Sequence, residues 1–190
     1  MATYVLVHGG GHGGWCYQKV ARLLRAAGHE AYTPTLTGLG ERSHLLSPAI
    51  DLDSHITDVV ALLTFEDLRD VILVGHSYGG MVITGVADRA SDRVGTVVSL
   101  DAANPVNGQS LVDVAGPVIE MTRPHGQVVD GVELVLLPAP GAASTLATRD
   151  PKLTDRARAA GMLWEIDTGH DLMVTEPEAV ASALLEIAAR

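Results

Sequence analysis

The chain has 190 residues, of which 47% are hydrophobic and 19% are charged, and its formal net charge is −10. This length and composition are typical of one globular domain with a core of its own, and the negative charge argues against binding nucleic acid or anionic membrane surfaces. The lone Cys16 excludes an intrachain disulfide, and the sequence shows neither a basic leader nor an apolar run long enough to span a bilayer. We therefore expect a single soluble domain over 1–190, located in the cytoplasm.

The first half of the chain alternates between expected strands and expected helices. Gly28 is placed to end the first of these helices, and Asp51 or Asp53 is placed to cap the second. In chain order, the expected strands are 4–8, 30–34, 71–74 and 94–101, and the expected helices are 15–27, about 56–63 and 81–90.

The second half gives a weaker signal between 102 and 130 and then alternates again. Its expected elements are a short helix at 110–115, strands at 132–137, 144–148 and 162–166, and helices at 151–160 and 177–189. Strands that alternate with helices form parallel sheets, because each helix carries the chain back to the start of the next strand. We expect an α/β fold in which a mainly parallel, six-stranded sheet has helices on both faces.

Residues 71–80 give the strongest functional signal. Four apolar residues predict a buried strand, and the sequence GHSYG at 75–79 then fits G-x-S-x-G, the turn that holds a nucleophilic serine between a strand and a helix. Glycine is needed on both sides because the neighbours of the serine crowd the next strand and helix. We predict that Ser77 is the nucleophile; the alternative is a glycine-rich turn with an inert serine.

The glycine loop at 9–14 has two interpretations. Its glycine spacing matches a dinucleotide-binding fingerprint, but the second strand ends without the acidic residue that would hold a ribose, so we expect no cofactor. The other interpretation is an oxyanion loop, in which the main-chain N–H groups of Gly10 and Tyr78 hold negative charge. Gly9, Gly11 and His12 would then contact the substrate.

His8 and His12 are four residues apart, a spacing that would suggest a metal site on a helix. The residues between them are glycines and will not form a helix, and no third ligand lies nearby in the sequence. We expect no metal site here.

A serine needs a base to become nucleophilic, and in this arrangement of strands the histidine comes last, after the final strand. His170, in the loop 167–171, is the histidine in that place, and the other seven precede the expected final strand. We predict that His170 is the base.

The sequence leaves open which residue is the acid that would orient His170. If 144–148 is a strand, Asp150 follows it in the right place, and Asp150 is the favoured acid. If 132–137 is that strand instead, no carboxylate follows it. Asp101, at the end of the strand 94–101, is the second candidate, and a site without a functional acid is the third possibility.

Together these motifs resemble those of α/β-hydrolases, and most of all the branch that contains plant methylesterases, hydroxynitrile lyases and bacterial esterase-like relatives. The resemblance is dense over 1–112 and good over 144–190. It rests on the segments 7–15 (VHGGGHGGW), 33–42 (TPTLTGLGER), 74–80 (VGHSYGG), 148–151 (TRDP) and 169–171 (GHD).

The chain departs from these relatives between about 112 and 143, where they carry a longer cap over the substrate pocket. The resemblance implies that residues 112–143 are the remnant of a cap, and that 132–137 belong to this remnant and not to the sheet. It implies a more open pocket, or one completed by another loop or by a partner chain in a homodimer. The substrate preference of these relatives does not transfer to this chain, because the cap normally determines that preference.

The resemblance implies a serine hydrolase that cleaves a small ester, lactone or thioester through an acyl-enzyme. Two alternatives stay open. One is carbon–carbon, cyanohydrin or polyketide-cyclising chemistry on the same serine and histidine. The other is a relative that binds a small molecule without catalysis.

Overall fold

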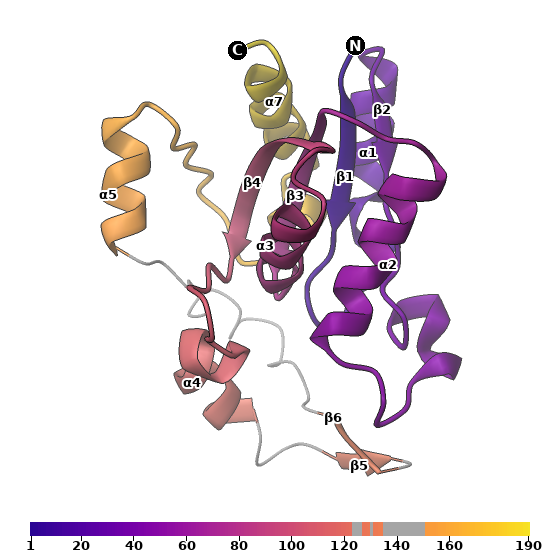
Figure 1. The fold of residues 1–190 in the computed structure, drawn as a ribbon. Helices are drawn as coiled ribbons and strands as arrows, with labels where there is room; N and C mark the ends of the chain where they lie inside the picture. Colours follow the sequence, from indigo (N-terminus) through magenta and orange to yellow (C-terminus); the bar gives the residue numbers. More distant parts are fainter. Residues whose placement is uncertain (123–126, 130, 135–150) are drawn as a thin grey trace.

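The computed structural model describes residues 1–122, 127–129, 131–134 and 151–190. In these ranges, four strands form one parallel sheet: β1 (Thr3–Val7), β2 (Glu30–Tyr32), β3 (Val71–Ser77) and β4 (Val94–Ala102). Their order across the sheet is β2-β1-β3-β4 (Figure 1). The α/β class that the sequence predicts is confirmed.

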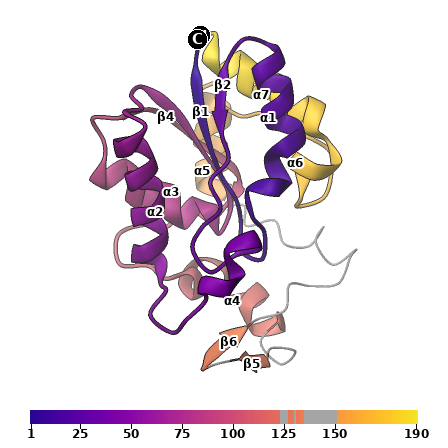
Figure 2. The ribbon, with the colours of Figure 1, turned by 90° about the vertical axis from the view of Figure 1, so that its right-hand side faces the viewer.

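Helices cover both faces of this sheet, as Figure 2 shows edge-on. The first face packs against α1 (Gln18–Ala26) and α7 (Pro177–Ala188), together with the short helices η1 (Gly14–Tyr17) and α6 (Leu172–Thr175). The second face packs against α2 (Leu52–Phe65) and α3 (Gly79–Arg89). A further short helix, η2 (Gly40–Leu45), lies in the loop between β2 and α2.

Strand alternation divides the core into two layers. In β1, Tyr4 and Leu6 point into the layer with α1 and α7, while Val5 and Val7 point into the layer with α2 and α3. All four side chains are fully buried, which is why the strand reads as a continuous apolar run rather than an alternating one.

Two expected helix ends are confirmed. The Asp51 side chain accepts a hydrogen bond from the main-chain N–H of Ser54, and the Ser54 side chain accepts one from Asp51 in return, which is a capping box at the start of α2. Gly28 follows α1 with a φ of +87°, a left-handed conformation that glycine adopts without steric cost.

The expected final strand at 162–166 is wrong. These residues form no strand, and Trp164 is engaged with the end of α7 instead: its indole N–H donates to Glu186 at 2.8 Å, and the Arg190 guanidinium lies 4.7 Å from its ring centre. The expected strand at 144–148 lies outside the described residues. The described sheet therefore has four strands where the sequence predicts six.

The segment after β4 leads away from the sheet, beyond the carboxyl ends of its strands (Figure 1). It contains α4 (Leu111–Thr122), which has non-helical backbone angles at Ala115 and is longer than the helix expected at 110–115. The strands β5 (Gln127–Val129) and β6 (Val132–Leu134) form a separate antiparallel pair. Residues 132–134 are therefore not part of the main sheet. Further along the chain, α5 (Pro151–Ala159) matches the helix expected at 151–160.

Among the helices of the described ranges, none is both long enough and apolar enough to cross a membrane.

Two fully buried tyrosines allow a matched test of how the core is held. The Tyr4 hydroxyl donates to the Leu184 carbonyl at 3.0 Å and so joins β1 to α7, whereas the Tyr17 hydroxyl has no hydrogen-bond partner among the described residues. We predict that Tyr4→Phe lowers the free energy of unfolding by about 1 kcal/mol, because a buried carbonyl loses its partner. Tyr17→Phe should leave it unchanged or raise it, because an unpaired buried hydroxyl is removed. Urea unfolding of both variants measures this; equal losses would contradict it.

Candidate active site

Ser77 lies at the sharp corner between β3 and α3. Its φ is +53°, in the left-handed region that residues other than glycine seldom adopt. The strand ends at Ser77, and α3 begins two residues later at Gly79. The serine therefore stands at the carboxyl edge of the sheet, next to the positive end of a helix.

The flanking glycines have the role that the sequence predicts. A Cβ atom built at Gly75 would lie 2.7 Å from the Gly79 carbonyl oxygen, and one built at Gly79 would lie 2.7 Å from the Val7 carbonyl oxygen. Neither site has room for a side chain. The two glycines allow α3 to start against β1 while the turn stays tight.

The first glycine loop lies against this corner. A Cβ atom built at Gly9 would be 2.8 Å from the Ser77 Cβ, and one built at Gly10 would be 3.8 Å from the Tyr78 Cβ. The structure thus brings together Gly9, Gly10, Ser77 and Tyr78, as the oxyanion interpretation requires.

Both ends of the glycine loop are fixed to the segment that follows β2. His8 Nε2 accepts a hydrogen bond from the Leu36 N–H at 3.1 Å, so its proton is on Nδ1 and is donated to the Gly9 carbonyl at 2.8 Å. At the other end, the Gly14 N–H donates to the Thr35 hydroxyl at 2.8 Å. Because both nitrogens of His8 are occupied, the His8–His12 pair does not offer two free metal ligands.

The remaining residues predicted to bind substrate lie further along the loop. Gly11 is exposed, with a φ of +74°. His12 is half-buried: its Nδ1 lies 3.0 Å from the Gly10 carbonyl oxygen, and its Nε2 lies 3.4 Å from an Asp171 carboxylate oxygen. His12 therefore connects the glycine loop to the loop that carries His170.

His170 pairs with Asp101. Its Nδ1 lies 2.6 Å from Asp101 Oδ2, the length of a strong, charge-assisted hydrogen bond. A carboxylate only accepts, so Nδ1 carries a proton and donates it to Asp101. Asp150, which the sequence analysis favours as the acid, lies outside the described residues.

A β-bulge aims the Asp101 side chain. His76 pairs with Leu100 and Ser77 pairs with Ala102, so Asp101 is an extra residue in β4 at this point. Its φ is +44°. Regular alternation would send Asp101 to the face opposite Leu100, and a bulge re-aims a side chain in this way. Nothing in the local sequence signals the bulge.

A second polar chain anchors the corner from the other side. The Tyr78 hydroxyl donates to His55 Nδ1 at 2.8 Å, and His55 Nε2 donates to the Thr37 carbonyl at 2.8 Å. Burial raises the pKa of Tyr78, so its phenol stays protonated and acts as a fixed donor. This chain of hydrogen bonds joins α2 to the residue after the serine, and no motif in the sequence indicates it.

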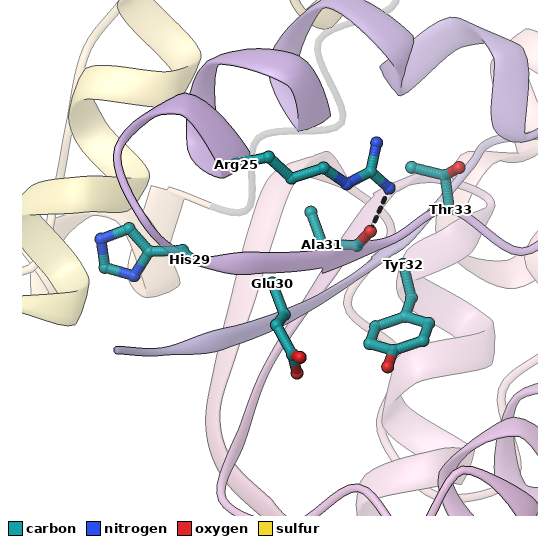
Figure 3. A pocket seen from close by; sticks show the side chains of 6 residues that line it. All are labelled: Arg25, His29, Glu30, Ala31, Tyr32 and Thr33. Atoms are coloured by element: carbon teal, nitrogen blue, oxygen red, sulfur yellow. Dashed lines mark hydrogen bonds between the residues drawn. The ribbon is translucent and has the colours of Figure 1, made fainter.

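An open pocket lies elsewhere, at the β2 edge of the sheet (Figure 3). Inside it the Arg25 guanidinium donates to the Ala31 carbonyl. Its lining contains none of the residues predicted for the active site. It is formed by Arg25, His29, Glu30, Ala31, Tyr32 and Thr33.

The buried His8 makes the stability of the protein depend on pH. Burial lowers the pKa of His8 to about 4, whereas an exposed histidine titrates near ~6.5. The unfolded chain therefore takes up a proton first, so this contribution is complete above pH ~6.5 and is lost as the pH falls to ~4. We predict that His8 accounts for a loss of about 3 kcal/mol in the free energy of unfolding over that window.

His8→Gln keeps a donor and an acceptor but does not titrate, so its stability should fall less steeply with acid than that of the wild type. Urea unfolding at several pH values measures both slopes. His44→Gln is the control, because His44 is exposed in the folded chain. Identical slopes for wild type and His8→Gln would show that His8 is not the cause.

The chain is similar in sequence to proteins named as esterases. It is 56% identical over 112 residues to a carbendazim hydrolyzing esterase of Nocardioides sp. (strain SG-4G), a match that covers 59% of this chain and 46% of the relative. It is 31% identical over 130 residues to Esterase PIR7B of Oryza sativa subsp. japonica, which covers 67% of this chain and 48% of the relative. The chain thus spans about half the length of the curated relatives it matches.

The fold is also similar to solved structures. That of polyneuridine aldehyde esterase superposes with a TM-score of 0.76 at 18% identity, covering 99% of each chain. The sequence matches the Alpha/beta hydrolase family over residues 4–152, which is well over half of its length. Sequence and architecture agree, and the chain belongs to the alpha/beta hydrolase family.

Proposed function

We propose that this chain is a serine hydrolase that cleaves a small ester, lactone or thioester, with Ser77 as nucleophile, His170 as base and Asp101 as acid. The observation that carries the proposal is the 2.6 Å contact between His170 Nδ1 and Asp101 Oδ2. It lies at the end of β4, the strand that pairs with β3, and β3 carries Ser77. The 56% identity to an esterase supports the same reaction class.

The hydrogen bond to Asp101 orients His170 as a general base requires. With its Nδ1 proton donated to Asp101, the ring presents the Nε2 lone pair. That lone pair takes the hydroxyl proton as Ser77 Oγ bonds to the substrate carbonyl carbon. The Asp101 carboxylate stays ionised and stabilises the imidazolium that forms.

The electron pair of the carbonyl bond moves to its oxygen, which the N–H groups of Gly10 and Tyr78 would hold. When the carbonyl re-forms, the bond to the leaving group breaks, and the His170 imidazolium returns the proton to that group. Water then attacks the acyl carbon and gives a proton to His170; as the bond to Ser77 Oγ breaks, His170 returns that proton to Oγ, which releases the acid and regenerates Ser77. No cofactor enters this sequence.

The first experiment asks whether Ser77 reacts. We expect a fluorophosphonate probe to label Ser77 and the chain to hydrolyse p-nitrophenyl acetate, and we expect Ser77→Ala to lose both. Ser91→Ala is the control, because Ser91 is an exposed serine just beyond α3 and should change nothing. Folded wild-type protein without labelling or turnover would contradict the proposal.

The second experiment decides which aspartate is the acid. Asp101→Asn should lower kcat by a factor on the order of 10⁴, because the amide stabilises the wrong imidazole tautomer. Asp150→Asn should leave kcat within about threefold of the wild type, because a residue outside the triad does not fix the imidazole tautomer of His170. The reverse pattern, with the large loss in Asp150→Asn, would assign the acid to Asp150 and overturn the role of Asp101.

A further inference from the structure

We propose that His76, the residue before the nucleophile, is a positioning residue that holds the main chain of His170 in place for proton transfer. This inference rests on the proposed function, because it assigns His76 a role in the reaction of Ser77 and His170. It concerns a side chain that the triad itself does not use.

Strand alternation places His76 in the layer that contains the His170 loop. Ile72 and Val74, four and two residues earlier in β3, lie in the same core cluster as Leu172 and Met173. Side chains two apart along a strand share a face, so His76 points into this layer too. Because Leu172 and Met173 directly follow the 167–171 loop, packing brings that loop to His76.

The contact between them is a hydrogen bond with a defined direction. His76 Nε2 lies 2.9 Å from the main-chain carbonyl oxygen of His170, and the ring centres are 4.6 Å apart. A carbonyl only accepts, so Nε2 carries the proton. Burial lowers the pKa of His76 to about 3, and the ring is therefore neutral at pH 7.

The other ring nitrogen of His76, Nδ1, shows that a histidine at this position costs folding free energy. In a neutral ring with the proton on Nε2, Nδ1 is an unprotonated acceptor, and it has no hydrogen-bond partner among the described residues. It faces the glycine loop: a Cβ atom built at Gly9 would lie 2.9 Å from it. An apolar side chain would avoid the cost of an unpaired buried nitrogen. What a histidine adds is the Nε2 donor.

The bond complements the one from Asp101. His170 is held by its ring through Asp101 at the end of β4, and by its main chain through His76 at the end of β3. Two fixed points define the direction of the remaining nitrogen, Nε2. Since His76 and Ser77 are adjacent in β3, the base is anchored one residue from its nucleophile, and small displacements at such a site cost large factors in rate.

The test compares His76→Leu, which removes the donor, with His76→Gln, which restores one on a neutral amide. The His76→Leu variant should have a kcat roughly 10- to 100-fold below that of the wild type and a KM within about twofold of it, because positioning acts on the chemical step. Gln should recover kcat to within about threefold of the wild type, because its amide N–H can again donate to the His170 carbonyl. His29→Leu is the matched control: His29 also bonds a main-chain group, the Ala2 N–H at 3.0 Å, but lies in the β2-edge pocket.

Two results would overturn the inference. The first is a His76→Leu variant with a lower Tm but wild-type kcat per folded molecule, which is the pattern of a purely structural residue. The second is an equal loss of kcat in His76→Leu and His76→Gln. If His76→Leu does not fold, His76→Met replaces it, because methionine is flexible and also lacks a donor.

A measurement on the wild type tests the bond without relying on activity. Nitrogen NMR of the histidine rings should show His76 as the neutral Nε2–H tautomer between pH 5 and pH 8; the Nδ1–H tautomer would overturn the inference. The proposed function fails separately, if the wild type shows no Ser77-dependent turnover. An active wild type together with an active His76→Leu variant would refute only the role of His76.

Discussion

The hydrogen bond between His170 and Asp101 is the constraint on which the site depends. It joins the last loop of the chain to the end of β4, across 69 residues of sequence. Because residues 162–166 form no strand, the loop that follows them is held at the sheet edge by side-chain contacts, and the Asp101 bond acts there together with the contacts of His12 and His76. The bond also selects the imidazole tautomer, so the same contact that holds the loop leaves a lone pair for chemistry.

The backbone is strained where the chemistry is proposed. Among the described residues, four that are not glycine have a positive φ. Two of them, Asp67 and Asp70, lie in the turn before β3, and the other two are Ser77 and Asp101. A left-handed conformation costs about 1–3 kcal/mol at such a residue, and packing must hold it in place. The close contacts at Gly75 and Gly79 supply that packing around Ser77.

The parts of the site that are local in sequence could be predicted, and the parts that depend on pairing across the sheet could not. The Ser77 corner and the glycine loop were predictable because each needs glycines at fixed spacing, and the structure places the two side by side. The sequence favours Asp150 over Asp101 because chain order asks for a carboxylate after the strand before the last one. The bulge that turns Asp101 toward His170 is a register shift between strands, which no local pattern reveals. The strand expected at 162–166 failed because an apolar run does not reveal that Trp164 packs against the chain terminus.

The central claim is that Ser77, His170 and Asp101 form one site beside the glycine loop. A crystal structure of the chain after reaction with a phosphonate ester tests it most directly. The account predicts phosphorus on Ser77 Oγ, one phosphonate oxygen within hydrogen-bond reach of the Gly10 and Tyr78 N–H groups, and His170 between Asp101 and Ser77. Phosphorus on another residue, or His170 paired with a different carboxylate, would contradict it.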